Sequence, residues 1–255
     1  MLSKSTIKYI HSLSLKKYRG IHGKFIAEGP KIVSELLESD LKISELFALQ
    51  EWTETNSEQY ANVNSVTTIS ESELQKISTL STPNQVLAIV DIPERHFSNA
   101  FARESMVIVL DDIRDPGNLG TIIRIADWFG IHHIVCTENC VDAYNPKTVQ
   151  ASMGSIGRVN LYYEDVAGML QSAAKDVAIY GAFLEGEPIY KVSFAKNGFL
   201  VIGNEANGIS TEIEKLISNK ISIPSGSKTG NHAESLNASI ATAIICSEMN
   251  RQKGL

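Results

Sequence analysis

The sequence predicts an α/β protein built from two domains. Short apolar runs alternate with stretches of helical periodicity along the chain, the pattern of strands and helices packed in layers. With 255 residues the chain is longer than one average domain, and its 43% hydrophobic and 20% charged residues are typical of globular proteins. Segment 93–105 has no sustained period. We therefore expect an N-terminal domain over 1–97, a linker over 98–105 and a C-terminal domain over 106–255.

In the N-terminal domain, the run KFIAEG (24–29) predicts a strand that enters a turn. Pro30 then opens a helix that we expect to continue to about Glu38. The remaining predicted elements are a helix at Glu71–Ile77 and strands at 44–50, 66–69 and 85–92.

The C-terminal domain begins with MVIVLDDI (106–113), a continuous apolar run typical of a fully buried parallel strand. Further strands are expected at 132–137, 158–162, 177–183, 198–205 and 220–224. Helices are expected at 116–129, 145–151, 164–175 and 211–218, with a long final helix from about Ser235.

Cysteine content and hydropathy exclude several classes of protein. The three cysteines are odd in number, which favours free thiols in a reduced, cytoplasmic protein. Cys136 and Cys140, with His132 and His133 nearby, lack a second ligand pair at zinc-like spacing, so we predict no metal site. No apolar run is long enough to span a bilayer, and the N-terminus lacks the apolar core of a secretion signal; we expect no membrane partner.

Charge is distributed unevenly along a chain whose net charge is −6. Residues 1–31 carry seven basic side chains and one acid, whereas residues 32–98 carry three bases and eleven acids. The basic segment can supply a surface that contacts RNA phosphates, or it can be a solvated amphipathic helix. The candidate RNA contacts in this segment are Lys16, Lys17, Arg19 and Lys24.

The first of three chemically suggestive blocks is LDDIRDPGNLGTIIRIADWFG (110–130). Asp115 and Pro116 are a good helix opening. Arg124 lies opposite the apolar stripe of that helix and is free for a site, while Asn118 lies in the first turn beside N–H groups that attract anions. The alternative is that Asn118 supplements a cap and Arg124 is a surface arginine.

The second block, LVIGNEANGIS (200–210), places a polar loop directly after a buried strand. The carboxyl ends of such strands form the ligand crevice of open α/β sheets. Gly203 and Gly208 permit close approach of a ligand, and Glu205 is a candidate to orient a polar partner. An ordinary loop is the alternative.

In the third block, residues 221–250, a strand ends at Pro224, and Ser235 or Glu234 opens the final helix. Ser235 and Asn237 are polar groups of its first turn, where capping alone can explain Ser235. The intervening SGSKTG lacks the upstream glycine of a phosphate-binding loop, and no G-x-G-x-x-G is present. Nucleotide hydrolysis and dinucleotide binding are therefore disfavoured.

The motifs DPGNLGTIIRIA, VIGNEANGIS and IP…ESLNASIATAI, in this order, resemble the three motifs of the SpoU (TrmH) family of RNA 2′-O-ribose methyltransferases, over about residues 105–252. The stretch KFIAEGPKIVSELL is similar to the start of that family's RNA-binding domain. The resemblance implies a parallel sheet of the SPOUT type with a trefoil knot, a ribosomal-protein-like N-terminal domain that binds the RNA substrate, S-adenosylmethionine as cofactor, and a homodimer joined by the helices of the first and third blocks.

The same resemblance assigns roles to particular positions. The implied catalytic residues are Arg124, Asn118, Glu205, Ser235 and Asn237. The implied cofactor pocket comprises Gly203, Asn204, Glu205, Gly208, Ile223, Pro224, Ser235 and Leu236. Because a guanidinium normally stays protonated in proteins, we interpret Arg124 mainly as a grip on an RNA phosphate that stabilises alkoxide charge, rather than as a general base.

The third block departs from the family pattern, because the ten residues SGSKTGNHAE between Pro224 and Ser235 exceed the usual spacing. They add Lys228 and His232, which either cover the donor or touch RNA, or belong to a tolerated surface insertion. The two-domain layout favours 23S ribosomal RNA as substrate. The alternatives are a tRNA 2′-O-methyltransferase and a non-catalytic RNA-binding protein with the same fold.

Overall fold

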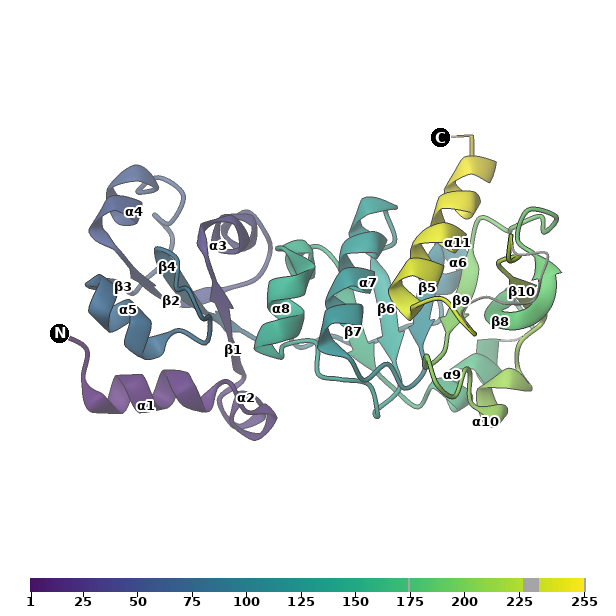
Figure 1. The fold of residues 1–255 in the computed structure, drawn as a ribbon, viewed down its shortest axis with the longest axis horizontal. Coiled ribbons are helices and arrows are strands. Elements are labelled where there is room, and N and C mark those ends of the chain that lie inside the picture. The colour runs from purple at the N-terminus through teal and green to yellow at the C-terminus, as the bar shows by residue number, and fades with distance from the viewer. Residues whose placement is uncertain (174, 227–233, 255) are drawn as a thin grey trace. The chain divides into compact units, whose positions relative to one another are not determined.

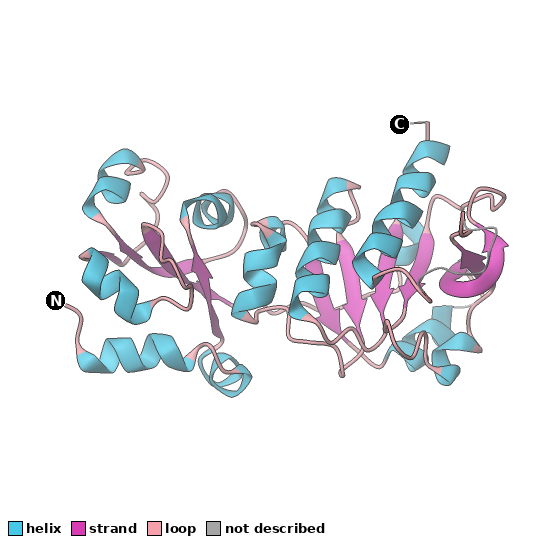
Figure 2. Ribbon diagram, in the orientation of Figure 1, coloured by secondary structure: helices cyan, strands magenta, loops and turns pink. Residues whose placement is uncertain are grey.

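The computed structural model describes residues 1–173, 175–226 and 234–254. It confirms the α/β class, with two separate sheets covered by helices (Figure 2). Contacts divide the chain into two compact units: Met1–Glu94 with Asp142–Arg158, and Arg95–Val141 with Val159–Leu255. The first stretch of the N-terminal unit thus ends at Glu94, and the unit also includes residues 142–158, from the range expected for the C-terminal domain.

The N-terminal unit, all of whose residues are described, holds a mixed four-stranded sheet in the order β1-β4-β2-β3. The strands are antiparallel except for the parallel pair β2 and β3. The strand bounds are β1 Lys24–Glu28, β2 Ile43–Ala48, β3 Val66–Thr68 and β4 Val86–Asp91. The helices are α1 Lys4–Ser12, α2 Lys16–His22, α3 Pro30–Leu37, α4 Gln50–Thr55, α5 Glu71–Ile77 and α8 Pro146–Ser152, followed by the 3-10 turn η1 Ser155–Gly157.

Local sequence explains where these helices begin. Pro30 occupies the first position of α3, where its missing N–H costs nothing. Ser70 and Glu73 form a capping box at the start of α5. The apolar faces of α1 and α5 then pack with the sheet in one buried cluster that includes Ile10, Ile77 and Leu87.

The six described strands of the C-terminal unit form a wholly parallel sheet in the order β10-β8-β9-β5-β6-β7. The strand bounds are β5 Met106–Leu110, β6 His133–Cys136, β7 Asn160–Tyr163, β8 Ile179–Pro188, β9 Gly198–Ile202 and β10 Asn219–Ser222. The strand order reverses between β5 and β9, the position where open α/β sheets form their ligand crevice. The trefoil knot stays a prediction, because strand order alone does not trace it.

Helices cover both faces of this sheet. The bounds are α6 Phe101–Glu104, α7 Pro116–Trp128, α9 Val166–Ala173, α10 Thr211–Glu214 and α11 Ala238–Gln252. Figure 1 shows α7 and α11 side by side on one face, in agreement with their contacts. The helices α6, α9 and α10 pack with β5 and β9 in one apolar cluster. None of the helices in the described part of the chain is long and apolar enough to cross a membrane.

The final helix begins later than expected. Its N-cap is Asn237, whose side-chain oxygen accepts hydrogen bonds from the amides of Ser239 and Ile240, and the helix proper starts at Ala238. The expectation that Ser235 or Glu234 opens the helix is therefore wrong, because the asparagine oxygen already satisfies the first free N–H groups.

Candidate active site

The three sequence blocks meet at one edge of the parallel sheet. Strands β5 and β9 are neighbours, with Leu110 paired to Ile202, so the loops that follow them leave from the same end. The amide of Asp111 donates a hydrogen bond of 2.9 Å to the carbonyl of Ile202, which extends the pairing beyond the strands. The first and second blocks are thus brought together by sheet register.

Two aspartates join these loops. The buried carboxylate of Asp111 accepts a 2.7 Å hydrogen bond from the amide of Ser210. The carbonyl of Asp112 accepts a 2.8 Å hydrogen bond from the side-chain amide of Asn204. Asp112 has a φ of 57°, a left-handed conformation uncommon for a residue with a side chain. Neither aspartate was among the predicted site residues, although two adjacent acids at the end of a buried strand were a signal for them.

The loop after β9 is a tight turn closed by its own backbone. Asn204 and Gly208 exchange two backbone hydrogen bonds, of 3.0 and 2.9 Å, and the side-chain oxygen of Asn204 accepts from the amide of Ala206 at 2.8 Å. A Cβ on Gly203 would lie 2.3 Å from the carbonyl carbon of Gly208, and Gly208 itself has a φ of +68°. Both glycines are therefore required by the turn.

A chain of side-chain hydrogen bonds links all three blocks. The side-chain amide of Asn118 donates to Glu205, and its oxygen accepts a 2.8 Å hydrogen bond from the side-chain amide of Asn237. The backbone amide of Asn118 donates to the carboxylate of Asp115, the N-cap of α7, at 2.8 Å. Because Asn118 and Asn237 stand at the N-termini of α7 and α11, two helix dipoles place partial positive charge beside the Glu205 carboxylate.

Two predicted catalytic residues, Arg124 and Ser235, take no part in these hydrogen bonds. Arg124 is exposed on α7, six residues beyond Asn118 and so about 9 Å along the helix axis. Within the described ranges no hydrogen bond or ion pair engages its guanidinium. Ser235 is exposed, and its hydroxyl has no hydrogen-bond partner among the residues that the structure covers. The predicted contacts Lys228 and His232 lie outside the described residues.

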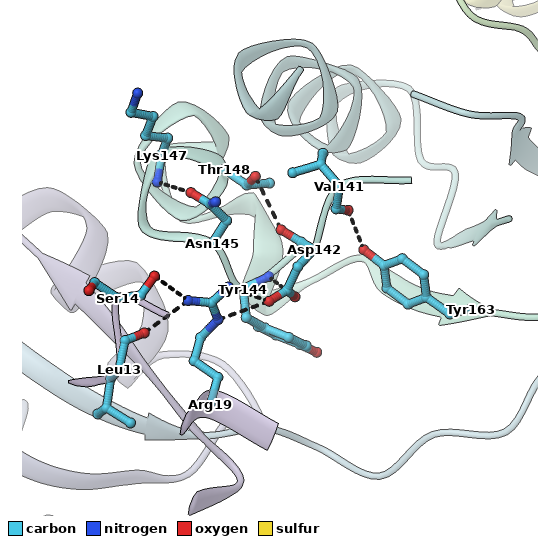
Figure 3. Close-up of polar contacts among 10 residues, drawn as sticks. All are labelled: Leu13, Ser14, Arg19, Val141, Asp142, Tyr144, Asn145, Lys147, Thr148 and Tyr163. Carbon is cyan, nitrogen blue, oxygen red and sulfur yellow. Dashed lines mark hydrogen bonds and ion pairs between the residues drawn. The ribbon is translucent and has the colours of Figure 1, made fainter. Parts of the chain in front are cut away.

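The structure corrects one predicted RNA contact. Arg19 is 2% exposed, and its guanidinium donates to the Asp142 carboxylate at 2.5 and 2.9 Å (Figure 3). It also donates to the carbonyls of Leu13 and Ser14, at 2.9 and 2.8 Å. With its donors occupied by protein acceptors, Arg19 does not serve as a surface for phosphate. Its role is to hold the turn between α1 and α2 against residue 142.

The remaining basic candidates differ from one another. Lys24 is half-buried and forms an ion pair with Asp91. Lys16 and Lys17 are exposed on α2, and no ion pair is formed by either within the described part of the chain. Of the predicted N-terminal contacts, these two lysines are the ones presented to solvent.

The three cysteines are free thiols, as predicted. A hydrogen bond from the Cys136 thiol lowers the pKa of the Cys140 thiol to about 7, while burial raises the pKa of Cys246 to about 12. The Cys140 sulfur also accepts a 3.2 Å hydrogen bond from the amide of Ile113, so it supports the loop that leads to α7. Among the described residues no cluster of three or more His, Cys, Asp or Glu side chains is arranged to hold a metal ion.

A polar cavity of about 530 Å³ lies at the carboxyl ends of β5, β6 and β7. Sequence reasoning did not find it, since its walls come from four separate loops. Its lining residues are Asp111, Asp112, Thr137, Glu138, Asn139, Glu164, Asp165, Val166, Ala167, Ser210, Glu212 and Ile213.

The donor set of the Glu205 site fits S-adenosylmethionine. The glycines let the loop after β9 close on itself, and half-buried Ile223 and Leu236, which is 47% exposed, stay the predicted apolar contacts of the cofactor. The carboxylate of Glu205 suits a neighbouring positive charge such as a sulfonium. The predicted cofactor contacts remain Gly203, Asn204, Glu205, Gly208, Ile223, Pro224, Ser235 and Leu236.

Known protein families match both units of the protein. The model of the SpoU rRNA Methylase family matches residues 105–247, which include all three blocks. The chain belongs to this family. A second family model, the MRM3-like substrate binding domain, matches residues 4–88. The SpoU match covers the parallel sheet and the residues hydrogen-bonded around Asn118, and the second match covers β1, β2, β3 and the beginning of β4.

Relatives of this SpoU chain extend over its full length. The 23S rRNA (guanosine(2553)-2'-O)-methyltransferase RlmP of Bacillus subtilis is 28% identical, over 94% of this chain and 93% of its own. The structure of a TrmH-family protein from Porphyromonas gingivalis aligns with a TM-score of 0.84 at 35% identity, covering 99% of both chains. The structure of an AdoMet-bound rRNA methyltransferase from Sinorhizobium meliloti aligns with a TM-score of 0.83 at 28% identity, covering 98% of this chain and 96% of its own.

Proposed function

We propose that the protein transfers a methyl group from S-adenosylmethionine to a ribose 2′-OH of RNA, with 23S ribosomal RNA as the substrate. The observation that carries this proposal is the hydrogen-bonded chain Glu205–Asn118–Asn237, which joins three distant blocks at the switch point of the sheet. The relatives with matching full-length architecture are named as rRNA methyltransferases, which supports the choice of RNA.

In this proposal each side chain has a physical task. S-adenosylmethionine, when bound, supplies an electrophilic methyl group on a sulfonium. Asn118 holds the Glu205 carboxylate in place, and Asn237 fixes the orientation of the Asn118 amide. The Glu205 oxygen that Asn118 does not engage can accept a hydrogen bond from a ribose hydroxyl, orient it and take up its proton as the hydroxyl oxygen is methylated and the donor sulfur becomes a neutral thioether. Such alignment of reacting groups supplies a large part of a rate enhancement.

Arg124 has a separate task, because it stands clear of this chain on the solvent side of α7. Its planar guanidinium matches the geometry of a phosphate and carries the charge that stabilises a developing alkoxide. We assign it to binding the RNA backbone and to stabilising that charge, without a role in removing the proton.

We also propose a homodimer through the face formed by α7 and α11. Trp128 of α7 and Ile240 of α11 are large apolar side chains that are 83% and 50% exposed, and a groove of about 400 Å³ is lined by Phe129, Tyr190 and four residues of α11, Ala243, Ile244, Ser247 and Glu248. Exposed apolar surface of this kind marks interaction sites. Light scattering should give twice the 27.9 kDa chain mass, and Trp128→Glu should give the monomer. Leu184→Glu, which alters a 74% exposed leucine of β8, is the control; a monomeric wild-type protein would contradict the proposal.

Transfer itself is tested with tritiated donor and deproteinised RNA, with calorimetry of donor binding alongside. We expect donor binding, and label in large-subunit RNA as 2′-O-methylribose. Label confined to tRNA would establish the alternative substrate. Absence of binding at millimolar donor would favour a non-catalytic RNA-binding protein.

A further inference from the structure

The outer face of α2 carries an unusual combination of side chains. Leu15 at its N-cap is 57% exposed, Ile21 is 63% exposed and Tyr18 is 37% exposed. Exposed large apolar side chains are informative when they gather in one place. Here they share a seven-residue helix with two exposed lysines. We call Lys16, Lys17, Tyr18, Ile21 and His22 the α2 platform.

The aromatic rings of the platform are arranged as a surface. Tyr18 and His22, one helical turn apart, lie with ring centroids 6.3 Å apart and planes inclined by 17°. Tyr9 of α1 supports His22 edge-on at 5.1 Å. The Lys17 ammonium lies 5.9 Å from the centre of the Tyr18 ring. This ammonium lies over the ring, so a base that stacks on Tyr18 takes its place and leaves the ammonium to bind the adjoining phosphate.

The platform is held rigidly from behind. Arg19, on the opposite side of the same helix, is buried and binds Asp142 and the carbonyls of the α1–α2 turn (Figure 3). Gly23 then ends the helix in a left-handed conformation, with φ of 61°. A helix fixed in this way loses little conformational freedom when its outer face binds a ligand.

The charge of the α2 platform favours a negatively charged partner. Lys16 and Lys17 form no ion pair within the residues described, whereas the other lysines near the sheet, Lys24 and Lys42, both face Asp91. Helix α2 itself carries no acidic side chain, because the acids of this unit lie on other elements, such as α3, α4 and α5. The surface therefore favours a polyanion, and its aromatic rings favour one with exposed bases.

We propose that the α2 platform binds unpaired nucleotides of the RNA substrate, with a base stacked on Tyr18 and the adjoining phosphates on Lys16 and Lys17. This inference rests on the proposed function for its RNA, and it adds the form of RNA that the N-terminal unit recognises. Base-paired RNA would reach the lysines but not the ring, since its bases are already stacked.

The test is binding of a fluorescent single-stranded oligouridine and of a hairpin of equal length to the full chain, measured without donor. Tyr18→Ala should weaken single-strand binding about tenfold, and Tyr18→Phe, which keeps the ring, should leave it unchanged. Lys16→Ala combined with Lys17→Ala should lower the slope of log affinity against log salt by about 1.4. Lys76→Ala, an exposed lysine of α5, is the matched control and should have no effect.

Wild-type single-strand affinity in Tyr18→Ala, or equal weakening for hairpin and single strand, would overturn the stacking proposal. Tighter, Tyr18-independent binding of a glutamate-rich peptide would overturn the choice of RNA. Circular dichroism of each variant verifies that the N-terminal unit is folded. Because the assay contains no donor, its failure is separate from a failure of methyl transfer, which donor calorimetry reports independently.

Discussion

Two arginines with the same predicted role occupy opposite surroundings. Arg19 lies in the N-terminal unit, buried, with hydrogen bonds to Asp142, Leu13 and Ser14. Arg124 lies in the C-terminal unit, exposed on α7, and has no protein partner within the described ranges. The comparison teaches that the acceptors that the fold supplies decide whether a basic side chain is structural or available to a ligand.

The largest effect that tests this comparison is expected at Arg19. Arg19→Met should lower the free energy of unfolding of the N-terminal unit by about 3–5 kcal/mol, because it leaves the Asp142 carboxylate without its charged partner. Urea denaturation followed by the fluorescence of Trp52, which is buried in this unit, measures the change. Asp142→Asn in the same background should restore part of the loss. A variant as stable as the wild type would show that the pair is not structural.

Arg124→Ala should have the complementary effect. We expect the rate of methyl transfer to fall by about 10²–10³, the usual result of removing one donor that stabilises developing charge, with the melting temperature unchanged. Arg124→Lys should recover only part of the rate, since an ammonium does not make the paired contacts of a guanidinium. Wild-type transfer by both variants would remove Arg124 from the reaction.

A smaller loss of transfer rate is expected on breaking the hydrogen bonds among Glu205, Asn118 and Asn237. Asn118→Ala breaks both side-chain hydrogen bonds, to Glu205 and from Asn237, and should lower the transfer rate by about tenfold to a hundredfold. Asn118→Asp should be worse, because it places a second carboxylate beside Glu205. Single-turnover rates at saturating donor distinguish the two variants. Equal rates would mean that the charge of Glu205 is unimportant.

The smallest expected effect is a difference in reactivity between two cysteine thiols that have different surroundings. Since the pKa of Cys140 is lowered to about 7, its thiolate fraction rises about tenfold from pH 6 to pH 8, and alkylation by iodoacetamide should rise with it. Cys246, with its pKa raised to about 12 by burial, should stay unmodified over this range. Mass spectrometry of the labelled peptides gives the order of reaction. Labelling of Cys246 before Cys140 would contradict these surroundings.

The sequence predicted those features that depend on local patterns or on sheet register. The apolar run at 106–113 became β5, and parallel strands brought Asn118 and Glu205 together because their loops leave from one edge. Asn237 was predicted only as a polar group of the first turn of the final helix, and its role as the N-cap was not foreseen. Ser235 and Asn237 lie two residues apart, and both residue types are favourable at an N-cap.

The role of Arg19 could not be predicted in this way, because its partner Asp142 lies 123 residues further along the chain. The packing of α8 with the N-terminal unit could not be predicted either, because α8 also lies far along the sequence from that unit's other elements. Local charge counts treat each arginine as available, whereas the fold decides which guanidinium finds a carboxylate. The acidic cavity beside Asp111 escaped detection for the same reason, since its walls come from separate loops.

The central claim is that this site methylates a ribose of ribosomal RNA, and it is tested most directly by mapping 2′-O-methylation across total RNA. A strain lacking the gene should be complemented in parallel with the wild-type gene and with Arg124→Ala. We predict that one position in 23S rRNA loses its methyl group in the deletion strain, regains it with the wild type and stays unmodified with the variant. An unchanged methylation map in the deletion strain, or full restoration by Arg124→Ala, would contradict the account.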